Sequence, residues 1–449
     1  MPGAQLQLAA YGAQDVYLTG NPQMTFFMEV YKRHTNFALE TIEQLFTGDA
    51  NFGKKVYSTI ERSGDLISKI FLNIKLPNLY EIFCVKDKYR PVQILGWVNK
   101  VGHAIIEYCE VEIGGTVIDK HYGLWLEVWS ELTVSCCKKD AYNFMIGGNE
   151  FSNTIHNQKE MNLRIPLQFW FNKNIGLALP IIALQYHQVK INIGFKRFGD
   201  VFSKISQIPI NQYIEKCNKV RILNAWLDVE YIFLDNDERK IFAQNSHKYL
   251  IEQLQVNTIS YKPNIQKYDY TNVDEYFEFI STFSASLDFN HPIKELIWVL
   301  RRRAIIEKND WFNFSISSNP DDIDLNIDEF QGDILVSAKL MLEGNDRFST
   351  KDAHYFRIVQ PYNHHTNVPD NYIYVYSFAL KPEDHQPSGT CNFSRIDKAN
   401  LLLNLKTNID RNMNVNDTIY ENELTLTVFA KNYNILKIMN GMAGVAYSN

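Results

Sequence analysis

The clearest pattern of hydrophobic and polar positions lies between residues 373 and 405. Most residues from 373 to 380 are β-branched or aromatic, which is typical of a pleated and largely buried strand. Pro382 ends that strand because proline cannot donate to a ladder, and residues 386–389 (Gln-Pro-Ser-Gly) have the composition of a type I β-turn. The leucines at 401, 403 and 405 then alternate with their neighbours, as in a strand with one buried face. This order of elements predicts an antiparallel β-sandwich.

The first half of the chain shows the same period of two. Ile70, Leu72, Ile74 and Leu76 alternate with mainly polar neighbours, and Gly114-Gly115 separates two strand-like triplets as a two-residue hairpin turn would. Further strand-like segments are expected at residues 189–193, 226–234, 293–300, 335–342 and 424–429. Both halves of the chain are therefore expected to be mainly β.

Three segments have helical signals instead. Leu124, Val128 and Leu132, with two tryptophans, repeat at helical spacing, so a helix is expected at one end of the first sandwich. Asp235 followed three residues later by Glu238 indicates a capped helix that ends near residue 243. The pair Asn21-Pro22 also predicts a short helix, with Phe26, Phe27, Val30 and Tyr31 available for packing.

Length and patterning together predict two domains. The chain has 449 residues, more than the roughly 250 to 300 at which single cores stop growing. Alternation is lost between residues 198 and 220, which is where a boundary is expected. The expected organisation is an N-terminal arm at residues 1–25, a first sandwich at 26–215 and a second sandwich at 216–449.

Charge and cysteine usage narrow the functional classes. The net charge is −6 and no long basic tract occurs, which argues against direct, non-specific binding of nucleic acid. The six cysteines lack metal-finger spacing and are interpreted as reduced thiols. Reduced thiols are typical of a protein that is synthesised in the cytosol. The first residues lack the pattern of a signal peptide, and the apolar runs are too short to span a bilayer.

An acidic stretch is the main candidate for a metal site. Asp322, Asp324, Asn326 and Asp328 occupy alternate positions and partly match a calcium-binding loop, with Asp333 eleven residues after the first. The sixth position is Ile327 where such loops need glycine, so a solvated acidic loop is favoured over a calcium site. No cofactor is expected.

Other candidate sites have simpler interpretations. His364-His365 are adjacent and share no spacing with cysteine or carboxylate ligands, so structural or surface roles are favoured. Arg301-Arg302-Arg303 would alternate between faces of a strand, which favours charge pairing at a subunit contact or solvent exposure over phosphate binding. No phosphate loop, nucleophile elbow or zinc-protease helix occurs, so no catalytic residue is assigned.

Several stretches in the same order resemble one protein family. They are residues 10–22, 177–187, 290–298, 430–444 and, above all, 377–395, where Ser-Phe-Ala-Leu-Lys-Pro is followed by Gln-Pro-Ser-Gly-Thr and Asn-Phe-Ser-Arg. The chain resembles the double jelly-roll major capsid proteins of nucleocytoplasmic large DNA viruses. The resemblance implies an all-β fold of two tandem eight-stranded antiparallel jelly-roll β-sandwiches, with long loops and a few short helices.

The resemblance also implies a function without catalysis. Three chains would form a capsomer with a pseudo-six-fold outline, and capsomers would tile an icosahedral shell. The implied partners are neighbouring capsomers, minor capsid proteins and penton proteins, with an inner membrane nearby but no insertion and no direct nucleic-acid contact. Candidate lattice contacts in the N-terminal arm are Ala13, Gln14, Asp15, Tyr17 and Asn21. The alternatives are a minor capsid component or a carbohydrate-binding β-sandwich.

Overall fold

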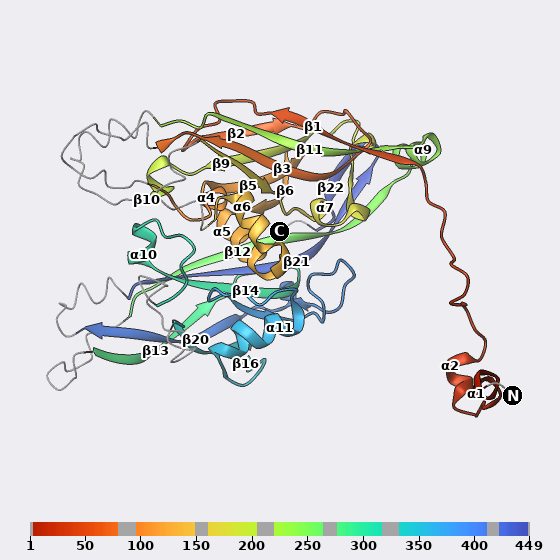
Figure 1. Cartoon of the computed structure of the whole chain (residues 1–449). Helices are drawn as coiled ribbons and strands as arrows, with labels where there is room; N and C mark the ends of the chain where they lie inside the picture. Colours follow the sequence, from red (N-terminus) through yellow and green to blue (C-terminus); the bar gives the residue numbers. More distant parts are fainter. Residues whose placement is uncertain are drawn as a thin grey trace. The chain divides into compact units, whose positions relative to one another are not determined.

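The computed structural model describes residues 3–79, 96–148, 160–203, 220–263, 276–316, 332–410 and 422–447. The chain divides into two units, Met1–Phe37 and Ala38–Asn449 (Figure 1). The smaller unit contains helices α1 (Gly3–Ala9) and α2 (Asp15–Thr19), and residues 22–36 form neither helix nor strand.

The helix predicted to begin at Pro22 is therefore wrong. Asn21 has a left-handed φ of 52°, and the Phe26 and Phe27 side chains are 88% and 99% exposed. A helix this short is marginal in water unless one face packs against something. Within this unit no such packing surface covers the two phenylalanines.

The larger unit begins with a sandwich of two antiparallel sheets. One sheet has the order β1 (Phe37–Leu45), β11 (Asn224–Leu234), β3 (Leu66–Leu76) and β7 (Met161–Pro166), with β8 (Leu179–Pro180) also paired to β3. The other has the order β2 (Lys55–Thr59), β9 (Val189–Phe195), β5 (Ile106–Ile113) and β6 (Thr116–His121). Both sheets contribute side chains to one hydrophobic core. A small extra pair joins β4 (Gly96–Trp97) to β10 (Phe202–Ser203).

A second sandwich follows in the sequence. Its first sheet has the order β12 (His247–Tyr261), β21 (Leu424–Met439), β14 (Pro292–Arg302) and β18 (Tyr374–Ser377), with β19 (Cys391–Asn392) on β14 and β22 (Met442–Val445) on β21. Its second sheet has the order β13 (Tyr276–Ser286), β20 (Ala399–Asp410), β15 (Leu335–Leu342) and β16 (Asn345–Asp346), with β17 (Lys351–Asp352) on β15. These sheets enclose a second core.

Short helices decorate and connect the sandwiches. The α-helices are α4 (Val101–Ala104), α5 (Gly123–Thr133), α6 (Cys136–Ile146), α7 (Trp170–Lys173), α9 (Asn236–Gln244), α10 (Arg303–Glu307) and α11 (Gln360–His364). The tighter or wider turns of helix are η3 (Ile175–Leu177), η4 (Ile181–Ala183), η5 (Phe198–Asp200), η9 (Tyr355–Val359) and η10 (Phe393–Arg395). No helix among the described residues is both long enough and apolar enough to cross a bilayer.

Local sequence signals are confirmed where they are strongest. Gly114 and Gly115 have φ of 59° and 85° between β5 and β6, as a two-residue hairpin turn with two left-handed positions requires. The Asp235 side chain accepts a hydrogen bond from the Asn236 amide at the start of α9. Leu401, Leu403 and Leu405 are each at most 1% exposed on one face of β20.

The two sandwiches share elements in ways that local patterning did not predict. β11 pairs with β3 in the first sheet, although it follows the expected boundary at 215/216. We therefore propose a boundary after β11. The ends of β12 and β21 also reach the first core, where Ile251, Leu436 and Ile438 are buried (Figure 1). The two long strands thus tie one sandwich to the other.

Helix α5 also connects the two cores. Leu126 packs in the first core, whereas Trp125, Val128, Trp129 and Leu132 pack in the second. The expectation of a helix at one end of the first sandwich is therefore only partly right. The helix forms as predicted, but it is apolar on more than one side, so it is buried between the sandwiches rather than on a surface.

Candidate functional site: a buried charged junction

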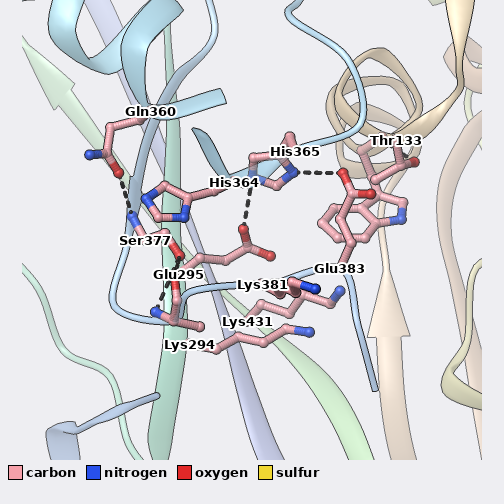
Figure 2. A network of polar contacts seen from close by, with 12 residues as sticks. Thr133, Lys294, Glu295, Gln360, His364, His365, Ser377, Lys381, Glu383 and Lys431 are labelled. Carbon is pink, nitrogen blue, oxygen red and sulfur yellow. Dashed lines mark hydrogen bonds and ion pairs between the residues drawn. The ribbon is translucent and has the colours of Figure 1, made fainter. Parts of the chain in front are cut away.

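Four charged side chains meet where β12, β14 and β21 lie next to α7. The carboxylate of Glu252 forms ion pairs with Lys431 Nζ at 2.8 Å, with Lys173 Nζ at 3.4 Å and with Lys294. The Lys294 side chain is fully buried, and the Lys431 side chain is 4% exposed. Figure 2 shows the Lys294 and Lys431 side chains running alongside one another. We refer to these four residues as the Glu252 cluster.

The charges of the Glu252 cluster perturb one another strongly. Burial alone would raise the Glu252 pKa, but the surrounding lysine charges, Lys431 foremost, outweigh it and hold that pKa well below its usual range. Burial, together with the nearby Lys431 ammonium, lowers the pKa of Lys294 to about 8. The cluster therefore depends on Glu252 as the single anion that three amines share.

The aromatic ring of Trp129 on α5 completes this cluster. Lys431 Nζ lies 3.5 Å from the centre of the Trp129 ring, and Lys173 Nζ lies 4.3 Å from it. A cation over an indole face is favourable, and more so when water is excluded. Since α5 and α7 precede β11 in the chain while Glu252 and Lys431 follow it, these contacts join the two sandwiches.

His365 bridges two carboxylates beside the cluster. Its Nε2 is 3.1 Å from a Glu295 oxygen, its Nδ1 is 3.0 Å from Glu383 Oε1, and its side chain is fully buried (Figure 2). The Thr366 amide donates to the same Glu383 oxygen at 2.8 Å. Burial opposes protonation of the imidazole, but the charges of Glu295 and Glu383 outweigh burial and raise the His365 pKa to about 9. We refer to this trio as the His365 bridge.

The His365 bridge makes stability depend on pH. Because the folded-state pKa is raised from 6.5 to about 9, the bridge should stabilise the protein fully below pH 6.5 and lose its effect as pH rises through 9. We expect His365→Gln to be less stable than the wild type by on the order of 2 to 3 kcal/mol near pH 6.5, and this gap to close by pH 10. Urea unfolding across this range measures the gap.

The neighbouring His364 supplies the matched control for this prediction. Its ring makes a hydrogen bond to the Leu380 carbonyl at 3.0 Å and meets no carboxylate among the described residues. His364→Gln should therefore leave the pH dependence of the wild type unchanged. A gap for His365→Gln that stays constant from pH 6.5 to 10 would contradict the assignment of an ionised bridge.

A second buried group of charges lies around α5. Lys100 pairs with Glu127 and, at 2.6 Å, with Glu131, while His103 Nδ1 lies 2.8 Å from the second Glu127 oxygen. Glu131 also meets Lys139 at 3.2 Å, and Lys139 reaches Asp370 of the second half at 2.5 Å. This group extends the charged junction along the helix.

The end of α5 is capped from the second half of the chain. The Asn367 amide donates to the Leu132 carbonyl, and the Asn367 side chain donates to the Glu131 carbonyl, both at 2.9 Å. The last carbonyls of a helix have no partner within it, so these bonds satisfy groups that would otherwise be buried unpaired. The geometry is that of a rigid internal support.

Comparison with known proteins identifies the family to which the chain belongs. Residues 25–235 match the family model described as "Major capsid protein N-terminus", and residues 238–444 match the one described as "Large eukaryotic DNA virus major capsid protein". The chain belongs to this family of capsid proteins. The predicted family resemblance is thus confirmed.

Individual relatives agree along the whole chain. The major capsid protein of Pyramimonas orientalis virus is 42% identical, and that of Paramecium bursaria Chlorella virus 1 is 37% identical, each with 100% of both chains covered. The crystal structure of PBCV-1 VP54, fitted into a reconstruction of the virophage Sputnik, superposes with a TM-score of 0.75 at 32% identity, covering 95% of this chain and 100% of that one. The Faustovirus major capsid protein shares the fold, with a TM-score of 0.67 at 12% identity, covering 96% and 94%.

These findings confirm the predicted fold and function. The two sandwiches of this capsid protein are a double jelly roll, and its role is structural rather than enzymatic, as in its relatives. Its place is the virion capsid. The alternative of a carbohydrate-binding sandwich is not favoured.

The arm residues predicted as lattice contacts lie in the smaller unit of the capsid protein. Asp15 begins α2, and its Oδ2 accepts from the Gly12 amide at 2.8 Å, while Tyr17 is 93% exposed and Asn21 has a left-handed φ. Ala13 and Gln14 precede the helix and are exposed. Their role in lattice contacts stays a prediction.

The acidic stretch Asp322, Asp324, Asn326 and Asp328 lies outside the described residues. Asp333, which closed the partial match, is described: it is 1% exposed, accepts from the Tyr374 hydroxyl at 2.7 Å and pairs with Arg357 at 3.3 Å. Its oxygens are thus engaged within the protein. Among the described residues, no group of three or more His, Cys, Asp or Glu side chains could hold a metal ion.

Arg303 and His365, from the arginine and histidine clusters of the sequence, both form ion pairs within the chain. Arg303 pairs within the chain, with Glu307 at 2.9 Å and Glu423 at 2.8 Å. His365 lies between Glu295 and Glu383, two carboxylates that are distant from it in sequence and that no local spacing could indicate. Sequence reasoning missed the Glu252 cluster entirely, because its members are separated by 42 and 79 residues in two of its pairs.

Proposed function

We propose that three copies of this chain form a capsomer with a pseudo-six-fold outline that occupies hexagonal positions of an icosahedral shell. One observation carries the proposal: β12, β21 and α5 contribute side chains to both cores, so the two jelly rolls form a single rigid block. Three blocks with two similar sandwiches each present six similar sides, which suits a closed three-fold arrangement. A 32% identical neighbour with a TM-score of 0.73 is described as part of the PBCV-1 virus capsid.

The N-terminal arm is proposed to link capsomers to their surroundings. Ala13, Gln14, Asp15, Tyr17 and Asn21 are the proposed contacts, and the exposed Tyr17 ring supports this because such rings are common anchors at interfaces. The partners proposed for the arm and for the capsomer rim are neighbouring capsomers, minor capsid proteins and penton proteins. An inner membrane would lie nearby without insertion, and no direct nucleic-acid contact is proposed.

Deleting residues 1–20 should leave the capsomer intact and impair shell assembly. The reason is that the cores of both jelly rolls consist of residues beyond the arm. Light scattering would report the oligomer of the deletion variant, and electron microscopy of expressed particles would report shells. Loss of the oligomer itself would contradict this division of labour.

Synthesis and assembly are proposed to take place in the host cytoplasm. The free thiols of Cys109, Cys136, Cys137 and Cys391 support a reducing site of synthesis.

A calcium site at the acidic stretch stays a minor proposal. Isothermal titration with the Asp324→Asn variant tests it, and tight binding lost in that variant would support it.

A further inference from the structure

A cavity opens beside the Glu252 cluster. It has a volume of about 320 Å³ and is lined mainly by Trp170, Lys173, Glu252, Glu383, Asp384 and His385. Of the three amines that share Glu252, Lys173 is the one that lines this cavity. Its side chain is 23% exposed, against 4% for Lys431 and none for Lys294. A small molecule can therefore reach Lys173 without disturbing the other two.

Lys173 shares its paired carboxylate with two other amines. Lys173, Lys294 and Lys431 all pair with Glu252, while Glu295 and Glu383 pair with His365. Like charges held close together at partly buried positions repel, and one of them is relieved by losing its proton. The neutral amine is the form that acts as a nucleophile.

Lys173 is the weakest-held of the three cations. Its distance to Glu252 is 3.4 Å against 2.8 Å for Lys431, and its distance to the Trp129 ring is 4.3 Å against 3.5 Å. Burial, followed by the repulsion from Lys431, lowers the Lys173 pKa well below its usual range. The distances and the charges therefore both indicate Lys173 as the lysine that most readily loses its proton.

We infer that Lys173 is a nucleophilic amine that forms an imine with small uncharged aldehydes entering this cavity. The nitrogen lone pair attacks the carbonyl carbon and a C–N bond forms. The carbonyl oxygen then leaves as water, with both amine protons accounted for in that water, and a C=N bond remains. An uncharged aldehyde is specified because Glu252, Glu383 and Asp384 line the cavity, whereas the other two amines of the cluster, Lys294 and Lys431, do not.

The test is reductive alkylation of the full chain at pH 7. Acetaldehyde with sodium cyanoborohydride, which delivers hydride to the imine, converts it to a stable ethylamine that peptide mass spectrometry locates. Lys69, an exposed lysine on β3, is the internal control. We expect Lys173 to be modified several-fold faster than Lys69, because the neighbouring Lys294 and Lys431 charges favour its neutral, nucleophilic form. An equal or slower rate at Lys173 would overturn the inference.

A second aldehyde tests the charge preference. Glyoxylate carries a carboxylate next to its aldehyde and should modify Lys173 several-fold more slowly relative to Lys69 than acetaldehyde does. Equal preference for the two reagents at Lys173 would overturn the restriction to uncharged aldehydes.

The variant Lys431→Met distinguishes an electrostatic effect on the Lys173 amine from simple access of the aldehyde to it. Removing the adjacent cation should slow modification of Lys173 several-fold, whereas a purely steric account predicts no change or a faster reaction. If this variant folds poorly, the pH profile of the wild type decides. Modification of Lys173 should rise at a pH below about 10.4, the ordinary pKa of a lysine side chain, and a profile that rises only near that value would contradict the inference.

Discussion

Replacing Glu252 by glutamine should lower the free energy of unfolding by about 3 to 5 kcal/mol, because removing one member of a buried ionic group leaves its partners uncompensated. Glutamine keeps the size of the side chain and removes only its charge. Lys294 and Lys431 would then remain buried beside the Trp129 ring without their shared anion. Urea unfolding at neutral pH measures the loss.

The sign of the pH dependence follows from the depressed Glu252 pKa. A carboxylate whose folded pKa lies below its unfolded value stabilises the protein above the unfolded value, and this effect is lost as pH falls through the folded value. The stability gap between wild type and Glu252→Gln should thus be present in full at pH 7.

An exposed ion pair provides the control for Glu252→Gln. Lys54 and Asp49 are paired with about half of each side chain exposed, so solvent screens their attraction. Asp49→Asn should therefore leave unfolding unchanged within error. A Glu252→Gln variant as stable as Asp49→Asn would show that the cluster does not support the fold.

Replacing Trp125 by alanine should also cost about 3 to 5 kcal/mol, the range for large aromatic side chains removed from a core. Trp125 is 1% exposed, and its ring lies 5.2 Å from that of Phe429 on β21 and 5.2 Å from that of Trp129. Because α5 carries this ring into the core of the second jelly roll, the variant should loosen the junction as well as the core.

Urea unfolding and limited proteolysis together check this second prediction. Trypsin should cleave the Trp125→Ala variant between the jelly rolls faster than it cleaves the wild type. Leu380→Ala is the control, because Leu380 is 73% exposed and its truncation should change stability by no more than about 0.5 kcal/mol. A loss below about 1 kcal/mol for Trp125→Ala would contradict the role assigned to α5.

Local patterns predicted the elements whose causes are local. The alternation of leucines at 401, 403 and 405 and the Gly114-Gly115 turn were found because side-chain period and turn chemistry act over a few residues. The helix expected at Pro22 does not form, because local signals alone do not stabilise a short helix. Its capping signal is local, but a short helix also needs a packing surface, and the sequence does not show whether one is available.

The junction could not be predicted because its causes are distant in the chain. Glu252 meets Lys173 across 79 residues, and Asn367 caps α5 across 236 residues. No spacing rule connects such positions. The family resemblance predicted two jelly rolls, but the placement of β11 in the first sheet and of Trp125 in the second core required the strand pairings and the packing.

The solution mass of the purified chain tests the proposed capsomer most directly. The chain has a mass of 52.3 kDa, so a homotrimer has three times that mass, about 157 kDa, in light scattering coupled to size exclusion. A single species at that mass, with a hexagonal outline in electron micrographs, is the result we predict. A species that stays at 52.3 kDa at every concentration would contradict a capsomer built from three copies of this chain.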